Sequence, residues 1–296
     1  MEEDANNNDK IIKHLVISGG GHSFFTFYGI LKEAHNQGFW SHVNIETIYG
    51  TSAGALIGLI MSLNIEFDIL DKYFIKRPWD KVFNLNIEQI FGIFDNLGIY
   101  SQEHICEIIN PLLCSKDLDV NITLLELYNH TNIELHAFAT ELNSFTTIDF
   151  SYKTHPTWKV IDVITASVSI PFIFKPVFID NECYIDGCIT NDFPIVEYIK
   201  HHDIDEALFI KKENKNNITL NKFCTFTNFF TIFIQRVLIK HANYDIPKNI
   251  IWVKDNTCTL TEITAVSSSE EIRKEMINMG ICLCTSFLEN IRACNP

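Results

Sequence analysis

The segment Gly50-Thr51-Ser52-Ala53-Gly54 restricts the fold of this chain more than any other. Strand-forming residues precede it at 46–49, and an apolar, helix-forming run follows it. A glycine-x-serine-x-glycine sequence in this setting predicts a sharp strand-to-helix turn that exposes the serine hydroxyl at the edge of a sheet. Gly50 and Gly54 are needed because a Cβ at either position would collide where strand and helix cross. We therefore interpret Ser52 as a nucleophile, with an ordinary structural loop as the alternative.

The flanking sequence predicts alternating strands and helices. Residues 13–18 form a predicted strand, 24–37 a helix with one apolar face, and 43–49 a second strand. This order predicts parallel pairing within one sheet, and hence an α/β fold with a mainly parallel central sheet. The other predicted elements are strands at 133–140, 145–150 and 207–211, a hairpin at 177–185, helices through 64–130 and over 160–169, and mainly helices after 217 with one apolar run at 250–253.

Length and composition are those of a globular protein with a sizeable core. The chain has 296 residues, of which 47% are hydrophobic and 20% are charged. This is enough for one large α/β domain or two modest ones. We predict a disordered tail over 1–10, a catalytic α/β domain over 11–215, and a helical C-terminal extension over 216–296 that packs on the same core.

The charge balance argues against some partners. Lys and Arg number 23 and Asp and Glu number 37, so the formal net charge is −14. We expect no nucleic-acid partner, because binding there requires cations that neutralise phosphates, and nonspecific docking on anionic membranes is disfavoured too. The basic cluster Lys72, Lys76, Arg77 and Lys81 is interpreted as a solvated helix face, with a contact for lipid headgroups as the alternative. A phenylalanine-rich stripe over 223–237 is interpreted as a helix packed on the sheet, with a membrane-surface helix as the alternative.

The cysteines and the first residues indicate the compartment. The nine cysteines show no spacing typical of zinc ligands, so we expect free thiols in a reducing compartment and no metal or other cofactor. The first nine residues are acidic and polar, the opposite of a signal peptide. No run reaches the about 18 apolar residues of a spanning helix. We therefore predict a cytoplasmic protein without a transmembrane segment, either free in solution or peripheral to membranes.

Gly19-Gly20-Gly21 lies between the first predicted strand and the first predicted helix. Consecutive bare peptide N–H groups at a helix N-terminus can hold an anion, such as the oxyanion of acyl transfer. A dinucleotide site is the competing interpretation, but it requires a third glycine at the helix start and an acidic residue about 20 positions later. Phe24 stands in place of that glycine, residues 39–41 carry no acid, and a Walker-type lysine is missing. We therefore favour an oxyanion loop.

A serine hydroxyl needs a base to take its proton before it can attack. Asp186 is the strongest candidate, because it ends a predicted strand directly before Gly187 and an elaborate loop over 188–194. An ordinary Asp-Gly β-turn is the alternative. The histidines after Ser52 do not lie in glycine-rich loops of the kind that position a catalytic imidazole, and we interpret each as a surface or core residue. They are His104, His130, His136, His155, His201, His202 and His241.

Five motifs in this order resemble the patatin-like phospholipases, a family of lipid acyl hydrolases, over residues 14–215. The motifs are Gly19-Gly20-Gly21, Gly50-Thr51-Ser52-Ala53-Gly54, residues 138–143, residues 166–176, and Asp186-Gly187-Cys188 followed by Asn191 and Pro194. The resemblance implies a three-layer α/β/α fold and a dyad without histidine, in which Ser52 attacks and Asp186 is the base. It also implies that Gly19, Gly20 and Gly21 form the oxyanion hole. The implied substrate is a phospholipid, lysophospholipid or other acyl lipid, met at a membrane or micelle surface.

The chain departs from the family pattern in two places. The family's glycine loop usually carries a Lys or Arg and then a Gly, where this chain has Ser23 and Phe24. Because one oxyanion donor is worth about 10²–10³ in rate, loss of the cation predicts slow turnover. Phe24 predicts a narrowed or redirected acyl entrance. Cys188 replaces the small residue usual after Asp-Gly, which is a milder change.

Other functions are compatible with the same residues. A thioesterase or neutral-lipid esterase would use the same dyad, because the shape of the pocket selects the substrate. A degraded site would leave a lipid-binding or interaction module, and Ser23 and Phe24 motivate this alternative. An ordinary α/β-hydrolase with a histidine triad fits less well, because the glycine loop and Ser52 belong to consecutive βα units.

Overall fold

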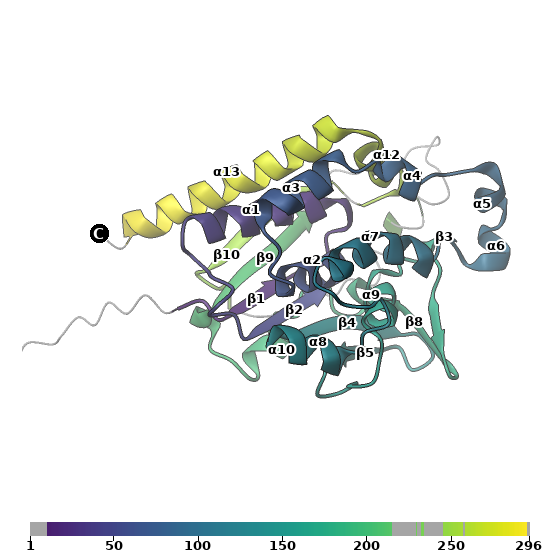
Figure 1. Cartoon of the computed structure of the whole chain (residues 1–296), viewed down its shortest axis with the longest axis horizontal. Coiled ribbons are helices and arrows are strands. Elements are labelled where there is room, and N and C mark those ends of the chain that lie inside the picture. The colour runs from purple at the N-terminus through teal and green to yellow at the C-terminus, as the bar shows by residue number, and fades with distance from the viewer. Residues whose placement is uncertain (1–10, 215–228, 230–231, 234–244, 257, 295–296) are drawn as a thin grey trace, which may run out of the picture.

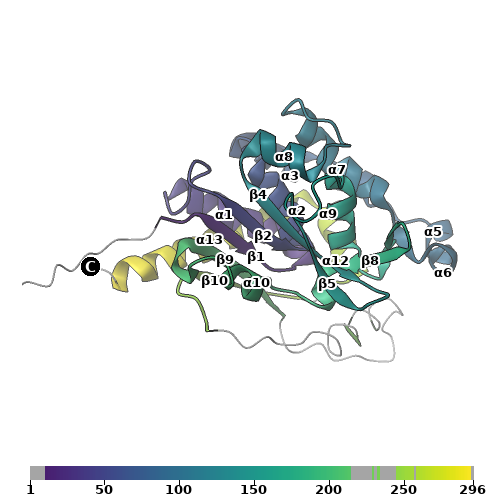
Figure 2. The ribbon, with the colours of Figure 1, turned by 90° about the horizontal axis from the view of Figure 1, so that it is seen from below.

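A central sheet with helices on both of its faces forms the protein (Figure 1). The computed structural model describes residues 11–214, 229, 232–233, 245–256 and 258–294, so the predictions for 1–10 and for most of 223–237 lie outside the described residues. Within them, the strand order of the main sheet is β10-β9-β1-β2-β4-β8-β7, and β5 pairs with β4. Figure 2, the view from below, shows the same layering. The predicted α/β fold with a mainly parallel central sheet is confirmed.

The strands of the main sheet are mostly parallel. The pairs β10–β9, β9–β1, β1–β2 and β2–β4 are parallel, whereas β8 is antiparallel to β4 and β7, and β5 is antiparallel to β4. The predicted parallel pairing of the first two strands and the hairpin at 177–185 are thus confirmed. The strands are β1 (His14–Ile17), β2 (Thr47–Thr51), β4 (Glu134–Glu141), β5 (Thr146–Phe150), β7 (Val177–Ile179), β8 (Glu182–Asp186), β9 (Ala207–Asn214) and β10 (Ile250–Asp255), with β3 (Gly98–Tyr100) and β6 (Phe172–Phe174) as a separate pair.

Side-chain caps fix where some helices begin. Thr123 Oγ1 accepts a hydrogen bond from the Glu126 N–H, and the Glu126 carboxylate accepts one from the Thr123 N–H, which closes a capping box. The α-helices are α1 (Phe24–Asn36), α2 (Ala53–Ser62), α3 (Phe67–Lys76), α4 (Trp79–Val82), α5 (Ile87–Phe91), α6 (Ile93–Asn96), α7 (Gln102–Cys114), α8 (Leu124–Thr131), α9 (Val160–Val168), α10 (Ile195–Ile199), α12 (Leu260–Ser268) and α13 (Glu270–Cys294). The described residues also form three short 3₁₀ helices, η1 (Gly21–Ser23), η2 (Gly187–Ile189) and η3 (Ile204–Glu206).

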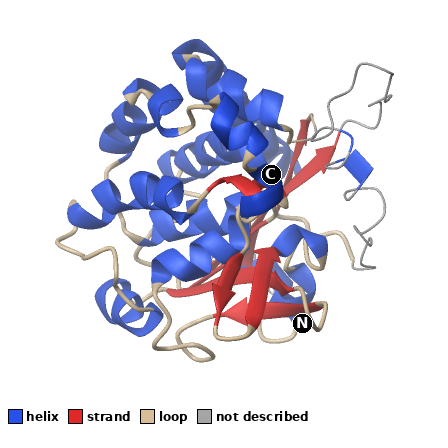
Figure 3. Cartoon of the chain, turned by 90° about the vertical axis from the view of Figure 1, so that its right-hand side faces the viewer, coloured by secondary structure: helices blue, strands red, loops and turns tan. Residues whose placement is uncertain are grey.

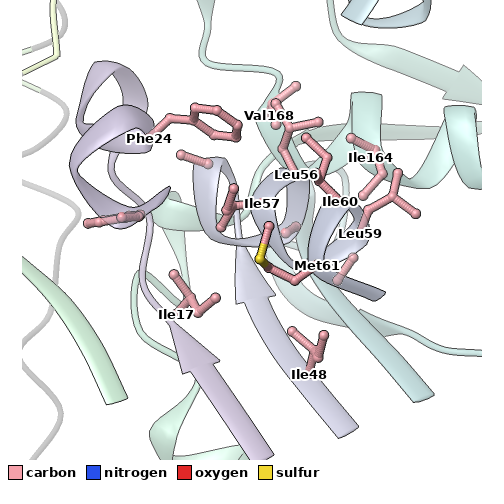
Figure 4. Close-up of a cluster of buried hydrophobic side chains, with 14 of the residues drawn as sticks. Ile17, Phe24, Ile48, Leu56, Ile57, Leu59, Ile60, Met61, Ile164 and Val168 are labelled. Carbon is pink, nitrogen blue, oxygen red and sulfur yellow. The ribbon is translucent and has the colours of Figure 1, made fainter. Parts of the chain in front are cut away.

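The sheet buries apolar side chains on both faces, because successive strand residues point to opposite sides. Leu15 and Ile17 belong to the larger core, which includes residues of α1, α2 and α9, whereas Val16 and Tyr49 belong to a smaller core beside α10. Most of the helices lie on one face of the sheet (Figure 3). Figure 4 shows part of the larger core, in which Leu56 of α2 lies near Val168 of α9, and Met61 of α2 lies on the side of Ile48 of β2. Every residue of β2 and of α2 is buried, so the turn between them is fixed by a packed element at each end.

The C-terminal region joins the same core. The apolar run at 250–253, within a region predicted to be mainly helical, is part of β10 and extends the sheet beside β9. The long helix α13 lies along α1 (Figure 1), and small residues allow the close approach. A Cβ on Gly29 would lie 2.1 Å from the carbonyl oxygen of Ile277, and one on Gly280 would lie 2.1 Å from that of Thr26. The division into domains at residue 215 stays a prediction.

Several surface features bear on the predicted partners. No helix in the described ranges is long and apolar enough to cross a membrane. In the basic cluster, Lys76 pairs with Glu270 at 2.9 Å and Arg77 with Glu107 at 3.0 Å. These acidic neighbours favour the interpretation of that cluster as a solvated face. The cysteines whose side chains are described carry free thiols.

Candidate active site

Ser52 stands at a sharp turn between β2 and α2. Its backbone has φ 54° and ψ −121°, a conformation that a residue with a side chain adopts at a cost of about 1–3 kcal/mol. A Cβ on Gly50 would lie 2.4 Å from the carbonyl oxygen of Gly54, and one on Gly54 would lie 2.3 Å from that of Ile17. Both positions therefore require glycine, as we argued from the sequence, and the close packing around them keeps the Ser52 backbone in place.

The structure brings Ser52 and Asp186 together, although 134 positions separate them in the chain. Ser52 Oγ donates a hydrogen bond to Asp186 Oδ2 at 2.7 Å. Asp186 is the last residue of β8, and β8 pairs with β4, which is the neighbour of β2. At Gly187 a Cβ would lie 2.2 Å from the carbonyl oxygen of Phe138, so only glycine lets the chain turn here.

Burial governs the acidity of Asp186. The residue is 1% exposed, and burial raises the pKa of its carboxyl group to about 6, while hydrogen bonds from Ser52 and Cys188 hold that pKa lower than burial alone would. The backbone N–H of Cys188 donates to Asp186 Oδ1 at 2.8 Å. A carboxylate with this pKa is mostly ionised at neutral pH and is a stronger base than an exposed aspartate. It meets the geometric and protonation requirements for a general base toward the Ser52 hydroxyl.

The glycine loop lies beside Ser52, because β1 and β2 are neighbouring parallel strands that end at the same edge. The Gly19 N–H donates to the carbonyl oxygen of Asp192 at 2.8 Å. The N–H groups of Gly20 and Gly21 take no part in the hydrogen bonds described at this loop. Buried peptide N–H groups are rarely left without a partner, so these two donors are suited to an incoming anion.

Each glycine of the loop is required by its surroundings. A Cβ on Gly19 would lie 2.1 Å from Cys188 Sγ, and one on Gly20 would lie 2.5 Å from the ring of Phe27. Gly21 has φ +53°, and a Cβ there would lie 2.2 Å from Cys258 Sγ. The loop is therefore bare backbone packed closely between side chains.

An apolar pocket opens at Ser52. The space between its walls, including open solvent at the mouth, is about 840 Å³. The wall combines Gly21 and Ser52 with mostly apolar side chains, among them Phe24, Leu56, Phe74, Trp79, Val168 and Phe174. Figure 4 shows three of these, Phe24 of α1, Leu56 of α2 and Val168 of α9, at one end of the core cluster. Phe24, which we expected at the acyl entrance, is thus part of the pocket wall.

Ser167 holds the backbone of Ser52, and we did not single it out from the sequence. The Ser52 N–H donates to Ser167 Oγ at 2.9 Å, and Ser167 Oγ donates to the carbonyl oxygen of Phe138 at 2.6 Å. This chain of hydrogen bonds ties the turn to α9 and β4. The only sequence signal was the position of Ser167 inside the fourth motif, at 166–176, because the sequence does not show which backbone group a buried serine binds.

Residues 15–199 match the patatin-like phospholipase family. The chain belongs to this family. It is therefore a hydrolase, and one that acts on lipids. The match includes both the glycine loop and the Ser52–Asp186 pair, whereas part of the pocket wall, including Cys258 and Val266, lies beyond the matched residues.

Related proteins occur in viruses. "Uncharacterized protein R571" of Acanthamoeba polyphaga mimivirus is 26% identical over 227 residues, which cover 76% of this chain and 74% of that protein. "Probable lipid hydrolase 463L" of Invertebrate iridescent virus 6 is 26% identical over 250 residues, which cover 83% of this chain and 79% of that protein. Among solved structures, VipD from Legionella pneumophila has a similar fold, with a TM-score of 0.57 and 18% identity over 94% of this chain and 67% of that one.

Proposed function

We propose that this patatin-like protein cleaves acyl esters of phospholipids or lysophospholipids through a dyad of Ser52 and Asp186. The observation that carries the proposal is the 2.7 Å hydrogen bond from Ser52 Oγ to the buried carboxylate of Asp186 at an apolar pocket. The name of the viral relative, a probable lipid hydrolase, agrees with this reaction class.

In the first half of the reaction, Ser52 Oγ attacks the ester carbonyl carbon while Asp186 Oδ2 takes the hydroxyl proton. The carbonyl oxygen becomes an oxyanion, which would accept hydrogen bonds from the N–H groups of Gly20 and Gly21. When the tetrahedral intermediate collapses, the ester bond breaks and the Asp186 carboxyl group returns the proton to the departing alkoxide. An acyl ester on Ser52 and a free alcohol result.

The second half repeats these roles with water. Asp186 takes a proton from a water molecule that attacks the acyl carbon of the Ser52 ester, and a second oxyanion forms in the same place. Its collapse expels Ser52 Oγ, which recovers its proton from Asp186. The products are a free fatty acid and the enzyme in its starting protonation state, so the cycle needs no metal or cofactor.

The pocket favours a lipid tail as the acyl group. Its wall is almost wholly apolar, and a long acyl chain gains free energy in proportion to the apolar area that it removes from water. A substrate of this kind is met in a membrane or micelle, so we propose that the protein works at such a surface. The same pocket would take the acyl chain of a thioester or a neutral lipid, and substrate comparison distinguishes these.

Two variants test the proposal. We expect Ser52→Ala and Asp186→Asn to abolish fatty-acid release and to keep a folded protein, because both replacements are nearly isosteric. Release would be measured on a parallel panel of phospholipid, lysophospholipid, triacylglycerol and acyl-CoA substrates. A fluorophosphonate probe should label the wild-type protein at Ser52. Fatty-acid release by purified Ser52→Ala protein would refute the dyad, and a folded wild-type protein that the probe does not label would favour a lipid-binding module instead.

A further inference from the structure

Charged side chains from β9 and β10 pack beneath the glycine loop, outside the five sequence motifs. Lys212 Nζ donates a hydrogen bond to the carbonyl oxygen of Gly20 at 3.1 Å. Asp255 Oδ2 accepts a hydrogen bond from Ser23 Oγ at 2.7 Å and lies 3.2 Å from His22 Nε2. The mechanism above assigns no role to these groups, although they contact the loop that would bind the oxyanion.

The register of the sheet places Lys212 at the loop. Ile17, the last residue of β1, pairs with Ile210 of β9, and β9 continues to Asn214 after β1 has ended. Lys212 therefore lies alongside the start of the loop, and its backbone N–H donates to Ser18 Oγ at 2.8 Å. The preceding residue, Lys211, points to the opposite face, where its ammonium group lies 5.0 Å from the ring centroid of Phe193.

The contact with the Gly20 carbonyl acts on the peptide that links Gly20 to Gly21. In a trans peptide the C=O and N–H bonds point in opposite directions. Because Lys212 holds the carbonyl oxygen on one side, the Gly21 N–H is directed to the other side, where Gly21 lines the pocket with Ser52. A cation on the carbonyl oxygen also polarises the peptide, which makes its N–H a stronger hydrogen-bond donor.

The charges around Lys212 fit a fixed cation in this place. Lys212 is 9% exposed, and burial lowers the pKa of its ammonium group, while the nearby side chains of Cys258, Asp255 and Asp192 oppose that change. Burial alone would also lower the pKa of His22, but its hydrogen bonds with Asp255 and Cys258 outweigh this effect and raise the pKa to about 9. Through its contacts with Ser23 and His22, the carboxylate of Asp255 ties the loop to the end of β10.

We propose that Lys212 is a positioning residue for the oxyanion hole: its ammonium group orients and polarises the Gly20–Gly21 peptide and replaces the cation that the loop lacks at Ser23. The inference rests on the proposed function, because it concerns the oxyanion formed during attack by Ser52. It removes the reason to expect a weakened site from Ser23, since the positive charge reaches the loop from strand β9.

A graded series of variants tests the proposal. Lys212→Met removes both the charge and the donor, whereas Lys212→Gln can keep a neutral donor for the Gly20 carbonyl. Lys211→Met is the matched control, because it removes the same side chain one position away on the opposite face. We expect kcat to fall about 10-fold in Lys212→Met, less than the about 10²–10³-fold loss of a whole oxyanion donor. The kcat of Lys212→Gln should lie between those of Lys212→Met and the wild type, and the kcat of Lys211→Met should equal that of the wild type. KM should change little in all three variants.

Inhibitor binding separates this role from general damage to the pocket. A long-chain trifluoromethyl ketone adds to Ser52 and forms a tetrahedral oxyanion, whereas a fatty amide of equal length binds without forming one. We expect Lys212→Met to lower the affinity for the ketone about 10-fold, in line with the loss in kcat, and to leave the affinity for the amide unchanged. If Lys212→Met shows no cooperative unfolding transition in a urea titration, the same inhibitor comparison is made with Lys212→Gln.

The outcomes identify which idea fails. Ketone affinity and kcat within about twofold of wild type in folded Lys212→Met would overturn the role of Lys212. An equal loss of affinity for the ketone and the amide would also overturn the role of Lys212, because it indicates a structural effect on the pocket. In either case, labelling of Ser52 by the fluorophosphonate probe would leave the dyad intact. Activity that survives Ser52→Ala would instead overturn the proposed function, whatever the Lys212 variants do.

Discussion

Asp186→Asn should make the protein more stable as well as inactive. The Asp186 carboxyl group is buried, and burial raises its pKa from the ordinary 3.8 to about 6. A folded-state pKa above the unfolded-state value means that the folded protein binds the proton more tightly between these two pH values. Stability from this group is therefore present below about pH 4 and is lost as pH rises through about 6.

The size of the effect follows from the shift. About two pKa units at 1.36 kcal/mol each give about 3 kcal/mol of lost stability above pH 6. Asparagine carries no charge, so the Asp186→Asn protein does not lose this free energy as pH rises. The difference in the free energy of unfolding between variant and wild type should grow by about 2.5 kcal/mol from pH 4 to pH 8, because part of the loss has already occurred at pH 4.

Urea titrations of both proteins between pH 4 and pH 8 measure this difference. Comparing the two proteins cancels the titration of other groups, such as His22 and His136, which both retain. Activity should have the opposite pH dependence, since the base must be ionised: at pH 5 about one tenth of the wild-type Asp186 is charged, so kcat/KM should be about 10-fold below its plateau. A stability difference that does not change with pH would refute the assignment of a raised pKa to Asp186.

Four further substitutions probe the scaffold and the pocket. Gly54→Ala should lower the free energy of unfolding by about 3 kcal/mol or more in urea titrations, because its Cβ would lie 2.3 Å from the Ile17 carbonyl oxygen. A Cβ added at Gly38 would have no atom within 4 Å, but the backbone there has φ +73°. Gly38→Ala should therefore lower the free energy of unfolding by only about 1–2 kcal/mol. Ser167→Ala removes the partner of the Ser52 N–H and should cost about 1–3 kcal/mol together with part of kcat, whereas unchanged stability and kcat would contradict the support that we assign to it. Val168→Phe should fill part of the pocket and lower kcat/KM for long-chain esters about 10-fold relative to acetyl esters, a ratio that would stay constant if acyl chains bind elsewhere.

The central strands and the turn at Ser52 could be predicted because their signals are local. Two glycines around a serine, with strand formers before and helix formers after, allow few backbone paths. The structure has this turn, with φ 54° at Ser52. Parallel pairing of the first strands follows from the alternation of strands and helices, and the hairpin at 177–185 follows from two short apolar runs around a polar turn.

Other parts of the site depend on contacts between distant segments. Ser167 and Lys212 are ordinary residues of a helix and a strand, and nothing in their immediate sequence shows which backbone groups they bind. The run at 250–253 is apolar but short, and a run of that length is compatible with either a helix or a strand. Its pairing with β9 decided the outcome, because the open edge of a sheet satisfies the hydrogen bonds of a new strand.

The sequence by itself determined the elements whose backbone is restricted by their own residues: the glycine loop, the turn at Ser52 and the turn after Asp186. Only the tertiary structure decided that Ser52 and Asp186 lie 2.7 Å apart, and that Lys212 reaches the carbonyl oxygen of Gly20. The reason is that glycine and turn preferences act over a few residues, whereas the distance between side chains far apart in the chain is set by the order and register of the strands that carry them.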